Sequence, residues 1–439
     1  MNKPITGQGE TARTHAVAVE DRREAAAIRI KRADFLLMGV AATAFALLYK
    51  SGIRRTLGEG TSEHQPIRES AVDRKQVFEN IHRGNQNTRQ RKGIFMYFDD
   101  FDKYNSGIGF DKALDNTAYA GFNIILPEVI TSSGLANYRN GMITENPDIF
   151  SRVGPGKDPL KELIDRAERR GIRVWPWIML FVGNEELRRK HPEWFAVSAY
   201  GRHSNFMDFL NPGARTFQIE AIAHLVREYR IQGINLDIEL PIDHISYSDR
   251  KGPGDKLGDK QRFMAENDIA GIKWPGDVLE GGRYNGLWLE WTNGKIANFL
   301  NELARKVRQE RKDLVISYDV TRDPDDPRYY SNWPSWLRRN PANILSPMIY
   351  QWDSHLNRWQ VDSIIRRDML LTMKDRKMVE LISVVGGSLY ATREVSASQL
   401  AESVKNAMTH NSNKSVNVFC YEVVDKANAW RDVREALRE

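Results

Sequence analysis

The chain has 439 residues, 41% of them apolar, and a formal net charge of +6, and such a length can bury a large hydrophobic core. Residues 1–92 hold 17 Lys and Arg against 10 Asp and Glu, whereas the remaining residues hold 47 against 48. The main body is therefore neutral, which argues against a nucleic-acid partner. Cys420 is the single cysteine, so the sequence excludes an intrachain disulfide, a thiolate zinc site and an iron–sulfur cluster.

The N-terminus has the pattern of an export signal. A basic tail, 1–34, precedes the uncharged apolar segment 35–49. Fifteen residues suit the core of a signal peptide, whereas a spanning helix needs roughly 20. Five basic residues within 20–34 against three within 50–64 favour an N-terminus that stays inside. We predict a periplasmic or envelope protein whose apolar segment is cleaved or kept as an inner-membrane anchor; a buried helix of the domain is the alternative.

The polar, aperiodic residues 50–91 predict a linker ahead of one domain over 92–439. Apolar, strand-like runs recur through that domain, at 93–98, 122–126, 172–180, 233–240, 314–320, 344–350, 379–385 and 415–421. Amphipathic stretches that predict helices lie between them, at 160–169, 214–229, 295–311, 359–371, 398–410 and 428–437. Asn211 and Pro212 open the helix at 214–229 as its N-cap and first-turn proline.

The order of these elements predicts the fold. Eight apolar runs separated by helical stretches indicate parallel strands covered by helices, and eight strands are the number that closes a barrel. The alternative is an open, doubly wound sheet, whose usual Gly-rich turn after the first strand is replaced here by Asp99-Asp100-Phe101-Asp102. We therefore predict an α/β fold with a single (β/α)8, or TIM, barrel.

The fourth apolar run ends in two carboxylates, Asp237 and Glu239. Alternate side chains of a strand share a face, so these two point the same way while Leu236 and Ile238 point the other way. Two like charges on one face of a buried strand repel each other and are costly to desolvate. An ion pair with a neighbouring arginine is the alternative; we favour a role in chemistry.

In a TIM barrel the active site lies where the strands end, and here those positions are rich in acids and aromatic residues. Carboxylates protonate a leaving oxygen and stabilise an oxocarbenium-like transition state, and aromatic rings stack on sugars. The sequence thus predicts a carbohydrate site. Its catalytic candidates are Asp237, Glu239 and Asp319, and its substrate-binding candidates are Asp99, Glu128, Trp177, Tyr350, Trp352, Asp353 and Glu422.

Within this site we predict that Asp237 is the essential carboxylate, as nucleophile or transition-state stabiliser. Glu239 lies nearer the end of the strand and is the expected proton donor, with Asp319 as the alternative. The separation of the two carboxyl groups decides the stereochemistry, since about 5–5.5 Å implies retention and roughly 6.5–9.5 Å implies inversion. The region 241–287 that follows contains scattered glycines and little periodicity, which predicts a long loop acting as a wall or lid.

Two other chemistries have weaker signals. Gly386-Gly387-Ser388 follows the seventh strand, where some barrels bind phosphate through backbone amides. His244, His355 and Asp353 could join Asp237 as metal ligands, but the chain contains no His-Glu-x-x-His motif. We predict neither a metal nor another cofactor.

Several motifs stand in order along residues 93–425. They are Asp158-Pro159-Leu160, Arg169-Arg170-Gly171-Ile172-Arg173-Val174-Trp175-Pro176-Trp177, His191-Pro192-Glu193-Trp194-Phe195, Gly201-Arg202, Leu210-Asn211-Pro212-Gly213, Gly233-Ile234-Asn235-Leu236-Asp237, the segment 333–337 and Ser346-Pro347-Met348-Ile349-Tyr350. With these motifs the chain resembles the family-ten-type glycosyl-hydrolase-like proteins, bacterial (β/α)8 barrels that are often exported. The resemblance implies a carbohydrate-active barrel with Asp237 as the key acid at the end of strand four.

The chain departs from this family at one informative place. Such proteins commonly follow that Asp with an aromatic residue and then Ile-Arg-Tyr-Pro, whereas this chain has Ile238-Glu239-Leu240-Pro241.

The leading hypothesis is an exported hydrolase of O-glycosidic bonds that acts on an envelope or extracellular polysaccharide. A barrel that binds glycans or scaffolds an envelope assembly without turnover is the alternative, and a sugar-phosphate enzyme using Gly386 and Gly387 is a third hypothesis.

Overall fold

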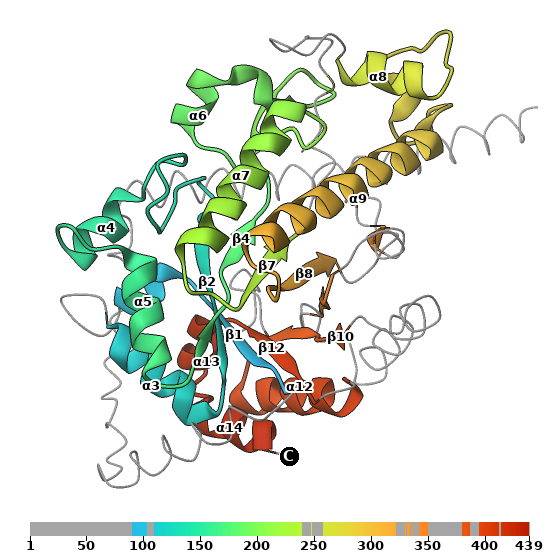
Figure 1. Cartoon of the computed structure of the whole chain (residues 1–439). Coiled ribbons are helices and arrows are strands. Elements are labelled where there is room, and N and C mark those ends of the chain that lie inside the picture. The colour runs from blue at the N-terminus through green and yellow to red at the C-terminus, as the bar shows by residue number, and fades with distance from the viewer. Residues whose placement is uncertain are drawn as a thin grey trace, which may run out of the picture. The chain divides into compact units, whose positions relative to one another are not determined.

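The computed structural model describes residues 90–102, 109–238, 247, 258–321, 330, 332–333, 336, 342–349, 380–386, 395–411 and 414–438 (Figure 1). All of them belong to one compact unit, Glu69–Glu439. The predicted tail, the apolar segment 35–49 and residues 50–89 of the linker lie outside the described residues. Within the described ranges, no helix combines the length and apolar character that crossing a membrane requires.

Eight parallel strand positions form a closed ring. In ring order the strands are β1 (Lys92–Met96), β2 (Ile124–Ile130), β4 (Trp177–Met179), β7 (Gly233–Asp237), β8 (Val315–Thr321), β9 (Ile344–Met348), β11 (Val384–Gly386) and β12 (Val416–Phe419). The ring closes because β12 pairs with β1, with Val416 opposite Lys92. The prediction of a closed (β/α)8 barrel is therefore confirmed.

Two of the predicted strands are each built from two short pieces. The third comprises β3 (Arg173–Val174) and β4, and the seventh comprises β10 (Glu380–Leu381) and β11. Pro176 separates β3 from β4; it has no N–H to donate, but its carbonyl accepts a hydrogen bond from the Asn235 N–H at 2.9 Å. The register of β2 against β4 shifts between Glu128 and Ile130.

Helices follow most of the strands (Figure 1). They include α3 (Phe110–Ala120), α5 (Pro159–Glu168), α7 (Pro212–Glu228), α9 (Asn285–Glu310), α12 (Ala397–His410) and α14 (Trp430–Arg438). Asn211 caps α7 as predicted, because its side chain accepts hydrogen bonds from the N–H groups of Gly213 and Ala214. The predicted helix at 359–371 lies outside the described residues.

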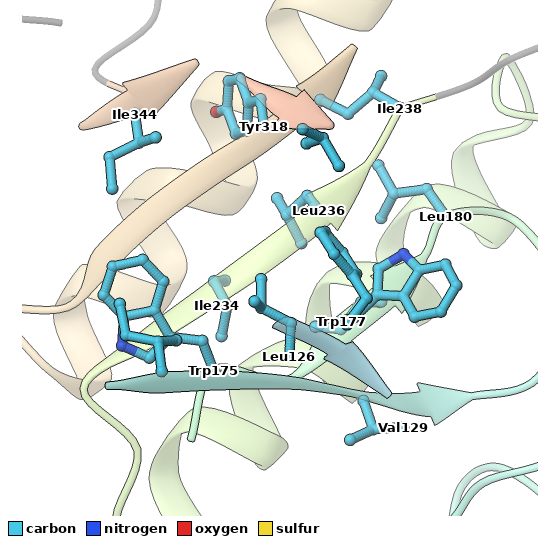
Figure 2. Close-up of a cluster of buried hydrophobic side chains, with 14 of the residues drawn as sticks. Leu126, Val129, Trp175, Trp177, Leu180, Ile234, Leu236, Ile238, Tyr318 and Ile344 are labelled. Carbon is cyan, nitrogen blue, oxygen red and sulfur yellow. The ribbon is translucent and has the colours of Figure 1, made fainter. Parts of the chain in front are cut away.

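The strands alternate between an apolar outer face and a mixed inner face. On β7, Ile234 and Leu236 are fully buried, and together with Ile238 they join an apolar cluster (Figure 2). The residues between them, Asn235 and Asp237, face the other way, toward the interior of the barrel. The apolar set anchors the strand, and the polar set lines the interior of the barrel.

Additional elements extend from the C-terminal side of the strands. They are η2 (Phe98–Asp102), α4 (Pro147–Val153), α6 (Glu185–Lys190), η3 (Pro192–Trp194), β5 (Phe195–Val197), β6 (His203–Met207), α8 (Asp259–Glu266), η5 (Gly276–Val278) and α13 (Tyr421–Lys426). β5 and β6 form an antiparallel hairpin. The long connection predicted over 241–287 contains α8, η5 and the first residues of α9, and its role as a wall or lid stays a prediction.

The His-Pro-Glu-Trp and Asn-Pro-Gly motifs pack against each other. The Trp194 indole stacks on the His191 ring at 3.8 Å, and a Cβ on Gly213 would lie 2.4 Å from Trp194 Nε1. Only glycine therefore fits at Gly213. Beside them, the buried Asp208 side chain shares a hydrogen bond with Asp259 of α8, which joins this region to the segment that follows β7.

Candidate active site

The central side chains of the site come from β7 and β8. Asp237 lies opposite Asp319 in the register of these strands, so both carboxylates face the same side of the sheet. Asn235 lies one layer deeper, and its Nδ2 donates hydrogen bonds to Asp319 Oδ1 at 2.9 Å and to Ser317 Oγ at 3.3 Å. Asp319 is buried and Asp237 is half-buried. Two carboxylates thus lie side by side at the C-terminal end of neighbouring strands.

One of these two carboxylates, Asp237, is hydrogen-bonded to an indole. Trp177 Nε1 donates a hydrogen bond to Asp237 Oδ2 at 3.2 Å. The Trp177 ring meets the edges or faces of three other rings, with centroid distances of 5.3 Å to Phe95, 5.4 Å to Tyr97 and 5.8 Å to Phe419. Because β1 and β2 separate β4 from β12 in the ring, Trp177 and Phe419 can meet only inside the barrel. These four rings form an aromatic wall beneath the acids.

Glu128 contributes a third carboxyl group from β2. It lies opposite Trp177 in the strand register, so its side chain also faces inward, and the residue is 7% exposed. Burial raises the pKa of Glu128 to about 8, with the negative charges of Asp99, Asp100 and Asp237 adding to the effect and a hydrogen bond from the Ser132 N–H opposing it. A carboxyl group with this pKa carries a proton at neutral pH.

The acids that follow β1 have two different environments. Asp100 is buried, and its Oδ2 accepts a hydrogen bond from the Tyr97 N–H at 2.9 Å. The Asp99 side chain is 45% exposed and forms an ion pair with Arg152 of α4 at 3.2 Å. Asp100 therefore shapes the loop, whereas Asp99 lies at the rim, where its charge still reaches Glu128.

The structure brings five of the predicted site residues into one electrostatic and hydrogen-bonded group, namely Asp99, Glu128, Trp177, Asp237 and Asp319. Glu422 lies in the first turn of α13 and forms an ion pair with Lys426 at 2.8 Å. The remaining predicted residues, Glu239, Tyr350, Trp352 and Asp353, lie outside the described residues.

Three strand boundaries differ from the sequence-based expectation. β2 continues to Ile130 and β8 to Thr321, so Glu128 and Asp319 lie within their strands rather than at the ends. Trp177 begins β4 instead of ending a strand, because Pro176 interrupts the pairing. Tyr318, next to Asp319 on β8, is buried in the apolar cluster that Figure 2 shows.

Sequence reasoning missed several inward-facing residues, including Asn235, Ser317, Phe95 and Phe419. A signal existed for them, since Asn235 and Ser317 stand two residues before Asp237 and Asp319, and alternate residues share a face. What the sequence lacked was the ring order, which brings Phe419 of the last strand onto Trp177.

The described residues give no support to the metal site or to the phosphate site considered from the sequence. Within them, no group of three or more His, Cys, Asp and Glu side chains is arranged to hold a metal ion; His244, His355 and Asp353 lie outside. Gly386 has a structural reason to be glycine, because its φ is +141° and a Cβ there would lie 1.9 Å from the Phe419 carbonyl oxygen. Gly387 and Ser388 lie outside the described residues.

A closed parallel barrel with acids and aromatic rings at the C-terminal ends of its strands is a glycoside-hydrolase-type barrel. The family described as "Glycosyl hydrolase-like 10" matches residues 104–376, and the chain belongs to this family. The resemblance seen in the sequence is therefore confirmed. A comparison with curated proteins finds no match.

Solved glycoside hydrolases share the fold. The glycoside hydrolase domain of PgaB (BpsB) from Bordetella bronchiseptica is 10% identical with a TM-score of 0.60, and the match covers 79% of this chain and 99% of that one. A β-galactosidase from Marinomonas ef1 is 10% identical (TM-score 0.56; 80% of this chain and 59% of that one). A β-galactosidase from Rahnella sp. R3 is 12% identical (TM-score 0.55; 80% and 55%).

Proposed function

We propose that the protein is a glycoside hydrolase that acts through Asp237 on an envelope or extracellular polysaccharide. The observation that carries the proposal is the placement of Asp237, inside the mouth of the barrel, opposite Asp319 and hydrogen-bonded to Trp177. An N–H donor stabilises the charged form of a carboxylate. A charged carboxylate beside an aromatic wall suits the nucleophile, or the stabiliser of an oxocarbenium-like centre, in glycoside hydrolysis.

Hydrolysis also needs a second carboxyl group. The candidates from the sequence are Glu239 and Asp319, of which Asp319 is described. Neighbouring strands lie about 4.8 Å apart, so rotamers of Asp237 and Asp319 span both the short separation of retaining enzymes and the longer one of inverting enzymes. The pair is compatible with either stereochemistry.

The proposed setting is outside the cytoplasm. The basic tail 1–34 and the apolar segment 35–49 support export or anchoring through the N-terminus, and the neutral main body supports a partner other than nucleic acid. A reporter that is active only outside the cytoplasm, fused after residue 60, should be active. A silent fusion would contradict the location and leave the chemistry untouched.

Turnover is tested with the full-length chain and a panel of bacterial polysaccharides, by measuring released reducing ends. We expect wild type to cleave at least one polysaccharide and Asp237→Asn to bind it in affinity electrophoresis without cleaving it. Glu380→Gln, at the opposite end of the barrel, is the matched control and should retain activity. Binding without cleavage by the wild type would favour the glycan-binding scaffold instead.

A further inference from the structure

Glu128 differs from the other acids near the mouth of the barrel. Asp99 pairs with Arg152 and Glu422 pairs with Lys426, but among the described residues no Lys or Arg forms an ion pair with Glu128. Among the described residues, the charges that act on Glu128 are all negative and come from Asp99, Asp100 and Asp237. A buried carboxyl group in such surroundings keeps its proton, because ionisation would place another negative charge beside existing ones.

The position of Glu128 connects it with the proposed chemistry. Its side chain faces inward from the middle of β2, opposite Trp177, and Trp177 in turn donates its N–H to Asp237. Trp177 is thus opposite Glu128 in the strand register and hydrogen-bonded to Asp237 through its indole. The backbone N–H of Ser132, in the loop after β2, opposes the rise in the pKa of the Glu128 carboxyl group.

Together these observations separate the roles of the carboxyl groups. Asp237 and Asp319 accept hydrogen bonds from the Trp177 indole and the Asn235 amide, and such donors stabilise charged carboxylates. Glu128 has acids around it and is buried. When neighbouring carboxyl groups have environments that favour opposite protonation states, the protonated member is the natural acid and the charged member the natural nucleophile or base.

We infer that Glu128 is the proton donor of this site and that Asp237 is its charged partner. This assignment rests on the proposed hydrolysis and replaces Glu239 as the donor. In the step, the bond between the anomeric carbon and the glycosidic oxygen breaks, its electron pair goes to that oxygen, and the oxygen takes the Glu128 proton. Water supplies hydroxide to the anomeric carbon and returns a proton to the acid pair, so the enzyme is restored.

The first test needs no substrate. Infrared difference spectra of the unliganded full-length chain, recorded from pH 5 to pH 10, should show a carboxylic-acid carbonyl band that persists at pH 7 and disappears near pH 8. Glu128→Gln should remove the part of the band that titrates near pH 8, and Asp237→Asn should shift the titration of that part to lower pH because one negative neighbour is gone. A band that is absent at pH 7, or unaffected by both substitutions, would overturn the assignment.

The second test uses leaving groups. Glutamine can still donate a hydrogen bond but cannot transfer a proton, so Glu128→Gln should lose about 10²–10⁴-fold in rate on the polysaccharide. On a 4-nitrophenyl glycoside of the same sugar, whose leaving group needs little protonation, the loss should be much smaller. Glu128→Asp, which keeps an acid, should recover part of the polysaccharide rate, and Glu380→Gln should match the wild type.

The outcomes distinguish two failures. A wild-type chain that hydrolyses neither the polysaccharides nor the aryl glycosides would overturn the proposed function and this assignment with it. An active wild type with an equally active Glu128→Gln would overturn only the assignment. If Glu239→Gln showed the leaving-group-dependent loss instead, Glu239 would be the donor. Should Glu128→Gln fail to fold, the infrared titration of Asp237→Asn still tests whether Glu128 is protonated at neutral pH beside Asp237.

Discussion

Buried glutamates at the two ends of the barrel have opposite electrostatic surroundings. At the N-terminal end of the strands, Glu380 forms an ion pair with Arg91 and accepts a hydrogen bond from Ser415 Oγ at 3.3 Å. At the C-terminal end, Glu128 has negative neighbours and, among the described residues, no ion pair. Both side chains are largely buried, so the difference lies in charge compensation rather than in exposure.

Cations at the N-terminal end have partners as well. The Arg91 and Arg173 guanidinium groups lie 6.0 and 5.9 Å from the Trp175 ring, and Arg173 Nη2 donates to Asn123 Oδ1 at 3.3 Å. Ion-paired charges are typical of a structural role, whereas a buried carboxyl group whose pKa is raised by burial and by like charges is typical of a functional site. The comparison supports the proposal of a structural role at the N-terminal end and of chemistry at the C-terminal end, where the active sites of TIM barrels lie.

The largest expected effect follows from removing the charge at the C-terminal end. Asp237→Asn should lower the turnover of a cleaved polysaccharide by about 10³-fold or more, because a neutral amide can neither attack nor stabilise the developing positive charge. Thermal unfolding should change little, since the amide oxygen can still accept the Trp177 N–H. Turnover within tenfold of wild type would remove Asp237 from the mechanism.

The pH dependence of stability measures the uncompensated carboxyl group directly. The pKa of Glu128 is about 8 in the folded chain against about 4.3 when unfolded. A raised acid pKa gives stability that is complete below the unfolded pKa and is lost as pH rises through the folded one. The loss for Glu128 is about 5 kcal/mol, since each pKa unit corresponds to about 1.4 kcal/mol.

Urea unfolding at pH 4, 7 and 9 checks this prediction. The free energy of unfolding of wild type should fall relative to that of Glu128→Gln as pH rises from 4 to 9. Burial and Asp259 also raise the pKa of Asp208, but this contribution is common to both proteins and cancels in the comparison. A difference that stays constant with pH would show that folding does not raise the pKa of Glu128.

The opposite end should respond in stability and leave catalysis alone. Glu380→Gln leaves Arg91 without its carboxylate, and losing the charged partner of a mostly buried group costs about 1–3 kcal/mol. Urea unfolding at pH 7 measures the cost, and the rate on the cleaved polysaccharide should equal that of wild type at a temperature where both are folded. A drop in rate without a drop in stability would contradict the division between the two ends.

The smallest effect is expected at an exposed pair on the C-terminal side. Lys426 is 67% exposed and pairs with Glu422 one helical turn away, so Lys426→Ala should cost at most about 0.5 kcal/mol. Thermal unfolding at low and high salt measures it, and the small difference should shrink further at high salt. A cost above 1 kcal/mol would mean that Glu422 belongs to the compensated, structural class of acids.

The sequence by itself determined the barrel, because the barrel follows from a repeated pattern of apolar runs and amphipathic stretches along the chain. Eight apolar runs with helices between them admit few folds, and the Asn211–Pro212 start of α7 follows from local capping chemistry. It also identified the strand that ends in Asp237, since alternation along one strand assigns faces without knowing the neighbours. These properties depend on residues close together in the chain.

Only the tertiary structure decided which side chains meet. Strand order brings Phe419 of β12 onto Trp177 of β4, and the register of β2 against β4 places Glu128 opposite Trp177, whose indole donates a hydrogen bond to Asp237. The protonation of Glu128 depends on burial and on charges from three other sequence positions, and neither can be read from a single segment. Charges interact through space, so the protonation states of the carboxyl groups depend on the neighbours that the closed barrel gives them.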